Sequence, residues 1–299
     1  WRSNASTTNH RRAADMALTI ACASNRVASV EEVIEQAERL RDHDDPNGLA
    51  SLAPLLGALA NDRELIVRLL NRRLGGRVDG GQTGLARSIP LGVGNRVRLR
   101  ANIWPSTADL TAGRVQQSDP TYDVAHDHNF HFLTAAYFGT GYITEIYEYD
   151  QDAIEGYIGE AVELRFLERT QFVTGRAMLY RGSRDVHVQF PPEDVSITLS
   201  LMFETPELKA RDQYYFDLQR QTINGFGRDT DTARRVDAVA MAGYAGNGES
   251  CQLLGDLARR HPCRRTRLSA YEALVRLLPD DEDKIWERAC GDAAALVAN

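Results

Sequence analysis

Between residues 85 and 204 the sequence is a succession of short segments with the two-residue period of β-strands. Val97, Leu99, Ala101 and Ile103 alternate with polar or larger residues. Further short strands are predicted at 142–149, 162–166, 171–173, 177–180, 186–190 and 197–202. No long helical pattern intervenes, which disfavours a parallel sheet with crossover helices. The pattern therefore predicts a central antiparallel β-barrel or sandwich, such as a jelly roll.

Helical patterns flank this region and make the expected fold class α+β. In the N-terminal flank, Ser29 and Glu32 form a capping box before a helix, the segment 45–48 breaks it, and another helix begins near Asn61. After Pro206, helices are predicted at 207–221, 231–244, 251–260, 266–278 and 281–297. We expect both flanks to pack against the outside of the barrel.

These patterns divide the chain into four parts. Residues 1–12 are set aside, because Ser3-Asn4-Ala5 resembles the remnant of an expression tag. An N-terminal helical segment at 13–84, the β-barrel at 85–205 and a C-terminal helical segment at 206–299 follow.

The composition narrows the classes of partner. A net charge of -7 argues against a generalised nucleic-acid or anionic membrane surface, and no apolar run approaches the roughly 18 residues of a membrane span. The four cysteines include no Cys-x-x-Cys pair, which argues against a structural zinc site or a disulfide framework. We therefore expect a cytoplasmic protein with free thiols that binds a small molecule and can assemble as a homodimer.

Histidines are the most informative polar residues in the predicted strands. His126 and His128 share one strand face because side chains alternate across a strand, and His187 follows on a later strand. Three imidazoles can hold one divalent metal and leave positions open for chemistry; the alternative is a surface strand with two solvated histidines. On a regular strand Phe130 and Phe132 would line the ligand face as substrate contacts. His131 would point away and become a ligand only at a bulge.

Four stretches give the middle region a family resemblance. They are 96–104 (RVRLRANIW), His126-Asp127-His128, 179–187 (LYRGSRDVH) and 196–203 (SITLSLMF). Together they resemble the cupin superfamily and, within it, the cysteine dioxygenase family, over residues 85–205. The resemblance implies a cupin barrel with a three-histidine metal site, and it favours Fe(II). Ligand chemistry alone would also admit Zn, Ni, Mn or Cu.

The sequence also departs from that family pattern. Where many cupins add a glutamate ligand, this chain has Phe132 and Leu133. Where some thiol dioxygenases have a crosslinked cysteine and tyrosine, it has Phe132 or Leu133 and Phe203, and the Ser-His-Tyr relay is absent. These differences point away from cysteine as the substrate.

Four further residues receive expected roles. The resemblance places Arg87 where family members hold the substrate carboxylate, and a guanidinium suits that task because it binds a carboxylate through two parallel hydrogen bonds. Tyr180 is the candidate catalytic hydrogen-bond donor to bound oxygen. Arg98 and Arg100 share one strand face, which could point into the cavity as anion anchors; we expect it to face solvent.

The resulting hypothesis is a mononuclear non-haem Fe(II) oxygenase that combines O2 with a small carboxylate-bearing or amino-acid-like substrate. One alternative is a metal-dependent cupin isomerase or lyase that does not use O2. Another is a non-catalytic cupin for sensing or assembly, with the helices as its interaction surface.

Overall fold

Two six-stranded antiparallel sheets form the centre of the computed structural model, which describes residues 18–75, 87–113, 122–228 and 230–298. The first sheet has the order β1 (Leu18–Ala21), β8 (Arg176–Tyr180), β5 (His131–Phe138), β10 (Ser196–Phe203), β3 (Val97–Trp104) and β2 (Ser88–Val93). The second has the order β12 (Thr222–Phe226), β11 (Tyr214–Asp217), β4 (Ala125–His126), β9 (Asp185–Phe190), β6 (Ile143–Glu148) and β7 (Arg165–Gln171).

The path of strands β3 to β10 is that of a jelly roll. Successive strands pass between the two sheets so that β8-β5-β10-β3 forms the middle of one and β4-β9-β6-β7 lies in the other. This double Greek-key arrangement is typical of jelly-roll domains, cupins included. The predicted α+β fold with a central antiparallel jelly roll is therefore confirmed.

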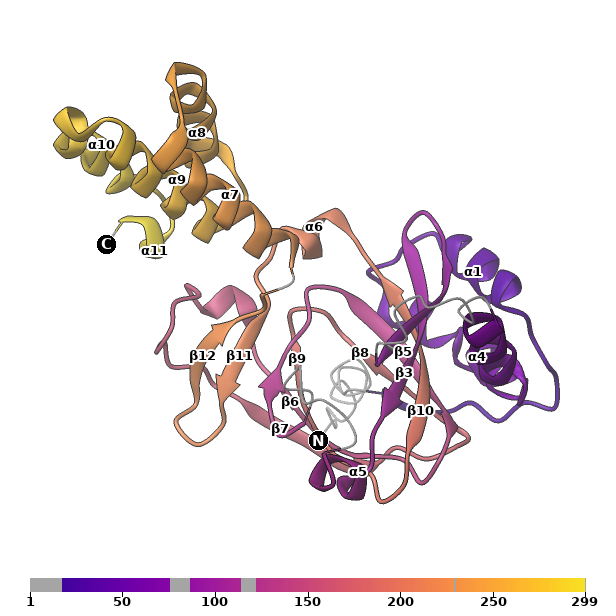
Figure 1. Ribbon diagram of the computed structural model, residues 1–299. Helices are drawn as coiled ribbons and strands as arrows, with labels where there is room; N and C mark the ends of the chain where they lie inside the picture. The colour runs from indigo at the N-terminus through magenta and orange to yellow at the C-terminus, as the bar shows by residue number, and fades with distance from the viewer. Residues whose placement is uncertain (1–17, 76–86, 114–121, 229, 299) are drawn as a thin grey trace, which may run out of the picture.

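The N-terminal helices cover the outer face of the first sheet. They are α1 (Val30–Glu38), α2 (Pro46–Ala50), α3 (Ala53–Ala60) and α4 (Leu65–Gly75), and α1 and α4 are seen beside this sheet in Figure 1. All four helices carry residues of one apolar cluster. Ser29 caps α1, as predicted, by accepting a hydrogen bond from the Glu32 backbone N–H at 3.1 Å. The close fit of α3 requires Gly57, because a Cβ there would lie 1.9 Å from the Cys22 carbonyl oxygen.

This packing determines which face of β3 is the inner one. Val97, Leu99 and Ala101 are buried in the cluster shared with the N-terminal helices. The alternate side chains of β3, including Arg98 and Arg100, therefore face the space between the two sheets. Our expectation that these arginines face solvent was wrong for Arg100, because the apolar face of this strand is covered by helices rather than by the barrel interior.

The segment after Pro206 differs from the predicted helix at 207–221. Only α6 (Pro206–Lys209) is helical, and β11 and β12 then form a hairpin that extends the second sheet. Tyr214 and Phe216 are buried while Tyr215 and Asp217 are partly exposed. This is the period of two expected for a strand, and pairing with β4 stabilises it. With β1, the hairpin also places strands outside the predicted barrel segment.

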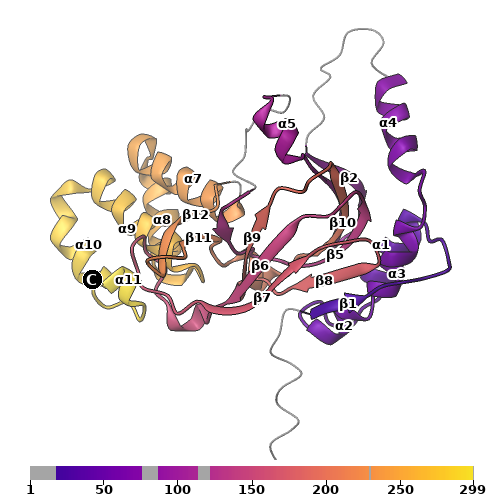
Figure 2. The ribbon, with the colours of Figure 1, turned by 90° about the horizontal axis from the view of Figure 1, so that it is seen from below.

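The remaining C-terminal helices form a separate cluster around α9 (Arg264–Leu277). They are α7 (Asp231–Ala245), α8 (Gly248–Arg260), α10 (Glu282–Ala289) and α11 (Ala295–Ala298), and they share their own apolar core. The helix expected at 281–297 is thus divided into α10 and α11. Seen from below, these helices project on the side of the sandwich away from α1–α4 (Figure 2).

Polar contacts join this cluster to the sandwich. Arg265 pairs with Asp212 at 2.6 Å, and the backbone N–H of Leu296 donates to Glu155 at 3.2 Å. The expectation that both helical flanks pack on the barrel holds for the N-terminal flank, whereas the C-terminal flank has a core of its own. Within the described ranges, none of the helices is both long enough and apolar enough to cross a membrane.

Candidate metal site

The site begins with two histidines directly opposite each other on neighbouring strands. His126 of β4 pairs with His187 of β9 in the antiparallel register, so both side chains project from the same face of the sheet. Their Nε2 atoms lie 3.0 Å apart. That separation is about what two adjacent ligands show when each lies about 2.1 Å from one ion.

His128 completes the cluster from the segment that follows β4. Its ring centroid lies 5.0 Å from that of His126 and 5.1 Å from that of His187. One ring nitrogen from each of the three histidines lies within 4.8 Å of the other two. The structure therefore brings together the three residues that the sequence predicted as ligands.

Asp127 holds the His126–His128 segment in place, with its side chain pointing away from the histidine cluster. Its buried carboxylate accepts a hydrogen bond from the Tyr214 backbone N–H and another from the Tyr149 hydroxyl, both at 2.6 Å. These bonds tie the His126–His128 segment to the β11–β12 hairpin. Asp127 thus orients the segment, as expected, and is not part of the histidine cluster.

Burial keeps the three imidazoles in the form that binds metals. It lowers the pKa of His126, and it lowers the pKa of His128 and His187 well below the usual value. The charge on a neighbouring imidazole and that on Arg100 act in the same direction for His128 and His187. All three rings are therefore neutral at pH 7, with lone pairs available for a metal.

In two of the histidines, the ring nitrogen that faces away from the cluster has a hydrogen-bonding neighbour. The Nδ1 of His126 lies 3.0 Å from the Val124 carbonyl oxygen, so that its Nε2 is the free ligand atom. The Nδ1 of His187 lies 3.1 Å from the Gln189 amide nitrogen, while the Gln189 Oε1 has no partner. Rotating that carboxamide would let Oε1 accept from Nδ1–H and leave Nε2 for a metal.

The donor set itself fits a divalent transition metal. Among the described residues it consists of three neutral nitrogens and no carboxylate, and imidazole suits iron, zinc, copper and nickel. The Nδ1 of His128 is buried and has no hydrogen-bond partner in the described part of the chain. An unsatisfied buried nitrogen beside two further imidazoles is consistent with a site built for an ion.

A cavity of about 1390 Å³ opens above the histidines. Phe130 and Phe132 line it, as predicted, with ring centroids 4.7 and 5.2 Å from that of His128. The opposite wall comes from the first sheet, and a third wall comes from the β11–β12 hairpin and the start of α7. The C-terminal part of the chain therefore helps to enclose the site.

Of the other predicted site residues, Arg87 lines the cavity, whereas Tyr180 and His131 do not. Tyr180 stacks on Phe132 with centroids 4.5 Å apart, but it is behind that ring and is not among the lining residues. His131 faces away, as expected for a regular strand: Gly182 donates to its Nδ1 at 2.9 Å, and its Nε2 lies 3.2 Å from Asp44.

Three residues near the histidines had no place in the sequence prediction. Gln189 stands two positions after His187, so strand alternation would have placed it on the ligand face. Gln213 and Tyr215 line the cavity from the hairpin, and the Tyr215 ring centroid lies 6.1 Å from that of His126. These two were missed because their segment was predicted to be helical.

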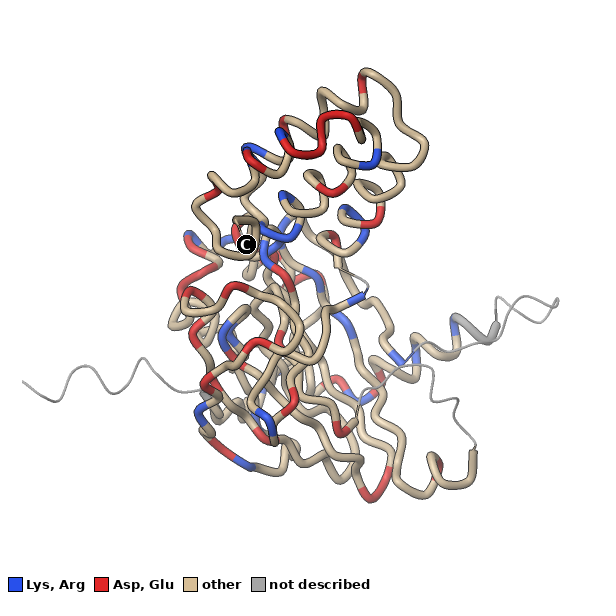
Figure 3. Tube along the Cα trace, turned by 90° about the vertical axis from the view of Figure 1, so that its left-hand side faces the viewer, with Lys and Arg blue, Asp and Glu red and all other residues tan. Residues whose placement is uncertain are grey.

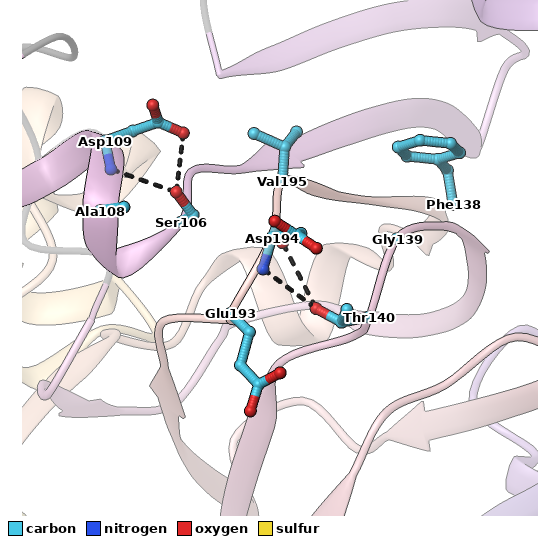
Figure 4. Close-up of a pocket in the computed structure, with 9 residues that line it drawn as sticks. All are labelled: Ser106, Ala108, Asp109, Phe138, Gly139, Thr140, Glu193, Asp194 and Val195. Carbon is cyan, nitrogen blue, oxygen red and sulfur yellow. Dashed lines mark hydrogen bonds between the residues drawn. The ribbon is translucent and has the colours of Figure 1, made fainter.

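A second cavity of about 540 Å³ lies elsewhere, beside the turn after β5 (Figure 4). Its polar groups bond to one another: Ser106 bonds to Asp109, and the Asp194 backbone N–H donates to Thr140. Its lining contains no histidine or cysteine. We therefore place the candidate chemistry at the histidine cluster.

Comparisons with known proteins add little to this description. No protein-family model matches the sequence, and no match was found among the curated proteins. Solved structures that it is similar to include a DMSP lyase (12% identity, 36% of this chain and 39% of that chain, TM-score 0.20). Another is hydroquinone 1,2-dioxygenase from Sphingomonas sp. TTNP3 (10% identity, 41% of this chain and 68% of that chain, TM-score 0.27). A third is a cupin protein from Bacteroides fragilis (11% identity, 43% of this chain and 86% of that chain, TM-score 0.24).

These alignments cover about two fifths of the chain, and the chain spans well under two thirds of the lyase. At such TM-scores we base no argument on them. The fold assignment rests on strand topology, and the candidate metal site rests on the geometry of the histidines.

Proposed function

We propose that the protein is a mononuclear non-haem Fe(II) oxygenase acting on a small carboxylate-bearing or amino-acid-like substrate. The observation that carries this proposal is the convergence of three neutral imidazoles, without a carboxylate, beneath a large cavity. Such a ligand set leaves coordination positions open for a substrate and O2. Bound iron would supply the redox chemistry.

The side chains around the cluster have separate tasks in this proposal. His126, His128 and His187 hold the ion, and Phe130 and Phe132 exclude water from the side of the cavity next to it. In the family resemblance, Arg87 holds the substrate carboxylate. Tyr180 lies against His187, with ring centroids 4.7 Å apart, and it is buried.

Metal analysis and oxygen uptake test the proposal together. Protein purified without chelators should contain about one iron per chain, and His187→Ala should lose it. His261→Ala is the matched control, because His261 lies at the end of α8 and bonds to the Cys263 backbone N–H. Uptake of O2 in the presence of iron and a carboxylate substrate should then be measured with an oxygen electrode.

Each alternative gives a distinct result in this experiment. Turnover of a substrate without O2 uptake would identify a metal-dependent isomerase or lyase and refute the oxygenase. Wild-type protein with no more metal than His187→Ala would refute a metal enzyme altogether and favour a sensing or assembly role.

A further inference from the structure

Gln213 stands opposite His128 across two neighbouring strands. In the antiparallel register of β11 with β4, Tyr215 lies opposite His126. The two segments stay in register beyond this pair, because the backbone N–H of Asp127 donates to a carbonyl oxygen of β11 at 3.2 Å. Two residues along from Tyr215 and His126, the register therefore places Gln213 opposite His128, and residues in that relation have Cβ atoms about 4.5–5.5 Å apart.

Strand alternation turns the Gln213 side chain towards the histidines. Tyr214 is buried on the other face of the hairpin, whereas Gln213 and Tyr215 both line the histidine cavity. Burial lowers the pKa of His128, and the nearby Gln213 side chain offsets part of that lowering by hydrogen bonding. Gln213 is therefore a polar neighbour of the His128 ring on the side of the hairpin.

The hairpin holds Gln213 in this position. The backbone N–H of Gly227, just beyond β12, donates to the Gln213 carbonyl oxygen at 2.7 Å. A Cβ at Gly227 would lie 3.0 Å from both the Cβ and the Cδ of Gln213, so the side chain lies directly against this glycine. The next residue, Tyr214, donates its backbone N–H to Asp127 at 2.6 Å. The carboxamide is thus carried by a segment that is tied to the His126–His128 segment.

A carboxamide suits a position beside a buried imidazole. Acidic and basic residues are interspersed along the chain (Figure 3), but the hairpin residues opposite His126 and His128, Tyr215 and Gln213, are uncharged. An amide oxygen accepts a hydrogen bond from a ring N–H without adding charge. A carboxylate in the same place would lose hydration whenever the site lacks an ion.

The other two histidines show what such a neighbour does. The Nδ1 of His126 lies 3.0 Å from the Val124 carbonyl oxygen, and that of His187 lies 3.1 Å from the Gln189 carboxamide. A hydrogen bond at one ring nitrogen decides which nitrogen keeps a lone pair for an ion. His128 has greater need of this constraint, because it lies beyond the end of β4 and strand pairing alone does not orient its ring.

We propose that Gln213 is the positioning residue for His128: its carboxamide oxygen accepts a hydrogen bond from the ring N–H of His128 and thereby directs the other ring nitrogen towards the ion. This inference rests on the metal site of the proposed function, and not on its oxygen chemistry. It makes metal binding depend on a residue of the C-terminal segment, outside the strands that carry the other two histidines.

The experiment measures Zn(II) affinity by chelator competition, with zinc as a redox-inert metal. Gln213→Leu should weaken binding by about 10- to 100-fold, because the ring of His128 loses its acceptor. Gln213→Glu should bind zinc at least as tightly as the wild type, because a carboxylate accepts the same hydrogen bond. Gln219→Leu is the matched control: Gln219 is exposed in the turn of the same hairpin, and its loss should leave the affinity unchanged.

A second measurement separates a hydrogen bond from packing. The ring nitrogens of His128 are observed by NMR in the metal-free protein at pH 7 and identified by their loss in His128→Asn. They should show a single tautomer in the wild type and a mixture of the two tautomers in Gln213→Leu. Thermal unfolding of each variant shows that a loss of affinity is not a loss of fold.

Four results would overturn the inference. They are zinc binding by Gln213→Leu as tight as that of the wild type, a loss in Gln213→Glu as large as that in Gln213→Leu, an equal loss in Gln219→Leu, and the same tautomer of His128 in the wild type and Gln213→Leu. The second would show that the shape of the side chain matters rather than its acceptor, and the third that the whole hairpin does.

The same measurements distinguish this inference from the proposed function. Zinc binding that depends on Gln213, in a protein that takes up no O2 when loaded with iron, would refute the oxygenase and leave the role of Gln213 standing. Metal binding and O2 uptake that are both unchanged in Gln213→Leu would do the opposite. Wild-type protein that binds no zinc would overturn both.

Discussion

Replacing Arg100 with methionine should make the protein more stable. In the wild-type structure the guanidinium Nε is enclosed without an acceptor among the described residues, and burial lowers the pKa of this arginine. Leaving one buried donor unsatisfied costs about 1–3 kcal/mol. Replacing buried charged groups with well-packed apolar side chains of similar volume is often neutral or stabilising by about 1–4 kcal/mol.

We therefore expect Arg100→Met to raise the free energy of unfolding by about 2 kcal/mol. For a sandwich of this size the corresponding rise in melting temperature is roughly 4–8 °C. Differential scanning calorimetry at pH 7 without added anions measures it. Arg98→Met is the control: Arg98 is exposed and pairs with Glu204, so that its loss should cost no more than about 1 kcal/mol.

Adding an anionic ligand should narrow the difference in stability between the two proteins. At ten times its dissociation constant, a probe such as the anion 3-phenylpropanoate should stabilise the wild-type protein by about 1.4 kcal/mol and leave Arg100→Met unchanged. A destabilisation of more than about 1 kcal/mol in Arg100→Met would refute the reasoning. It would mean that the protein itself compensates the charge of Arg100.

Three further predictions concern other parts of the molecule. Gln189→Leu should weaken metal affinity by about 10- to 100-fold in a chelator competition, because the histidine beside it loses its hydrogen-bond partner; unchanged affinity would contradict this. Arg267 lowers the pKa of Asp292 through two hydrogen bonds of 2.8 Å, so this pair stabilises the C-terminal helices above about pH 4 and ceases to do so as the pH falls further. In acid titrations followed by circular dichroism, Asp292→Asn should therefore be less stable than the wild type at pH 7 and should lose less stability below pH 4. Parallel stability curves for the two proteins would show that the Arg267–Asp292 pair does not cause the loss in acid. Gly57→Ala should destabilise by about 1–3 kcal/mol in denaturant titrations, because the added methyl would meet the Cys22 carbonyl oxygen; a neutral effect would show that α3 can shift.

Strand alternation explains why the histidine cluster could be predicted from the sequence. His126 and His128 are two residues apart, and Phe130 and Phe132 continue the same spacing. Even though β4 ends at His126, all four side chains reach the cavity. The spacing of two residues was sufficient because the chain stays extended enough between β4 and β5 to keep these side chains on one side, although residues 127–130 lie outside both strands.

The direction of Arg100 could not be predicted in the same way. The alternation of β3 correctly separates its two faces, but it does not say which face is internal. That choice depends on the N-terminal helices, which bury Val97 and Leu99 from the outside. Likewise, the sequence at 214–226 forms strands because β4 offers an edge to pair with, a contact between segments far apart in the sequence.

The same pairing links the metal segment to the wall that contacts the ligand. Asp127 lies between two of the histidines and accepts a hydrogen bond from the first residue of β11, Tyr214. Any shift of the hairpin would therefore be transmitted to His126 and His128, and any shift of the histidines would move Tyr215 at the cavity. Although the jelly roll supplies the histidines, the position of the ligand relative to them depends on residues from the C-terminal segment. In this protein the hairpin and the start of α7 therefore contribute to the cavity wall together with the strands that carry the histidines.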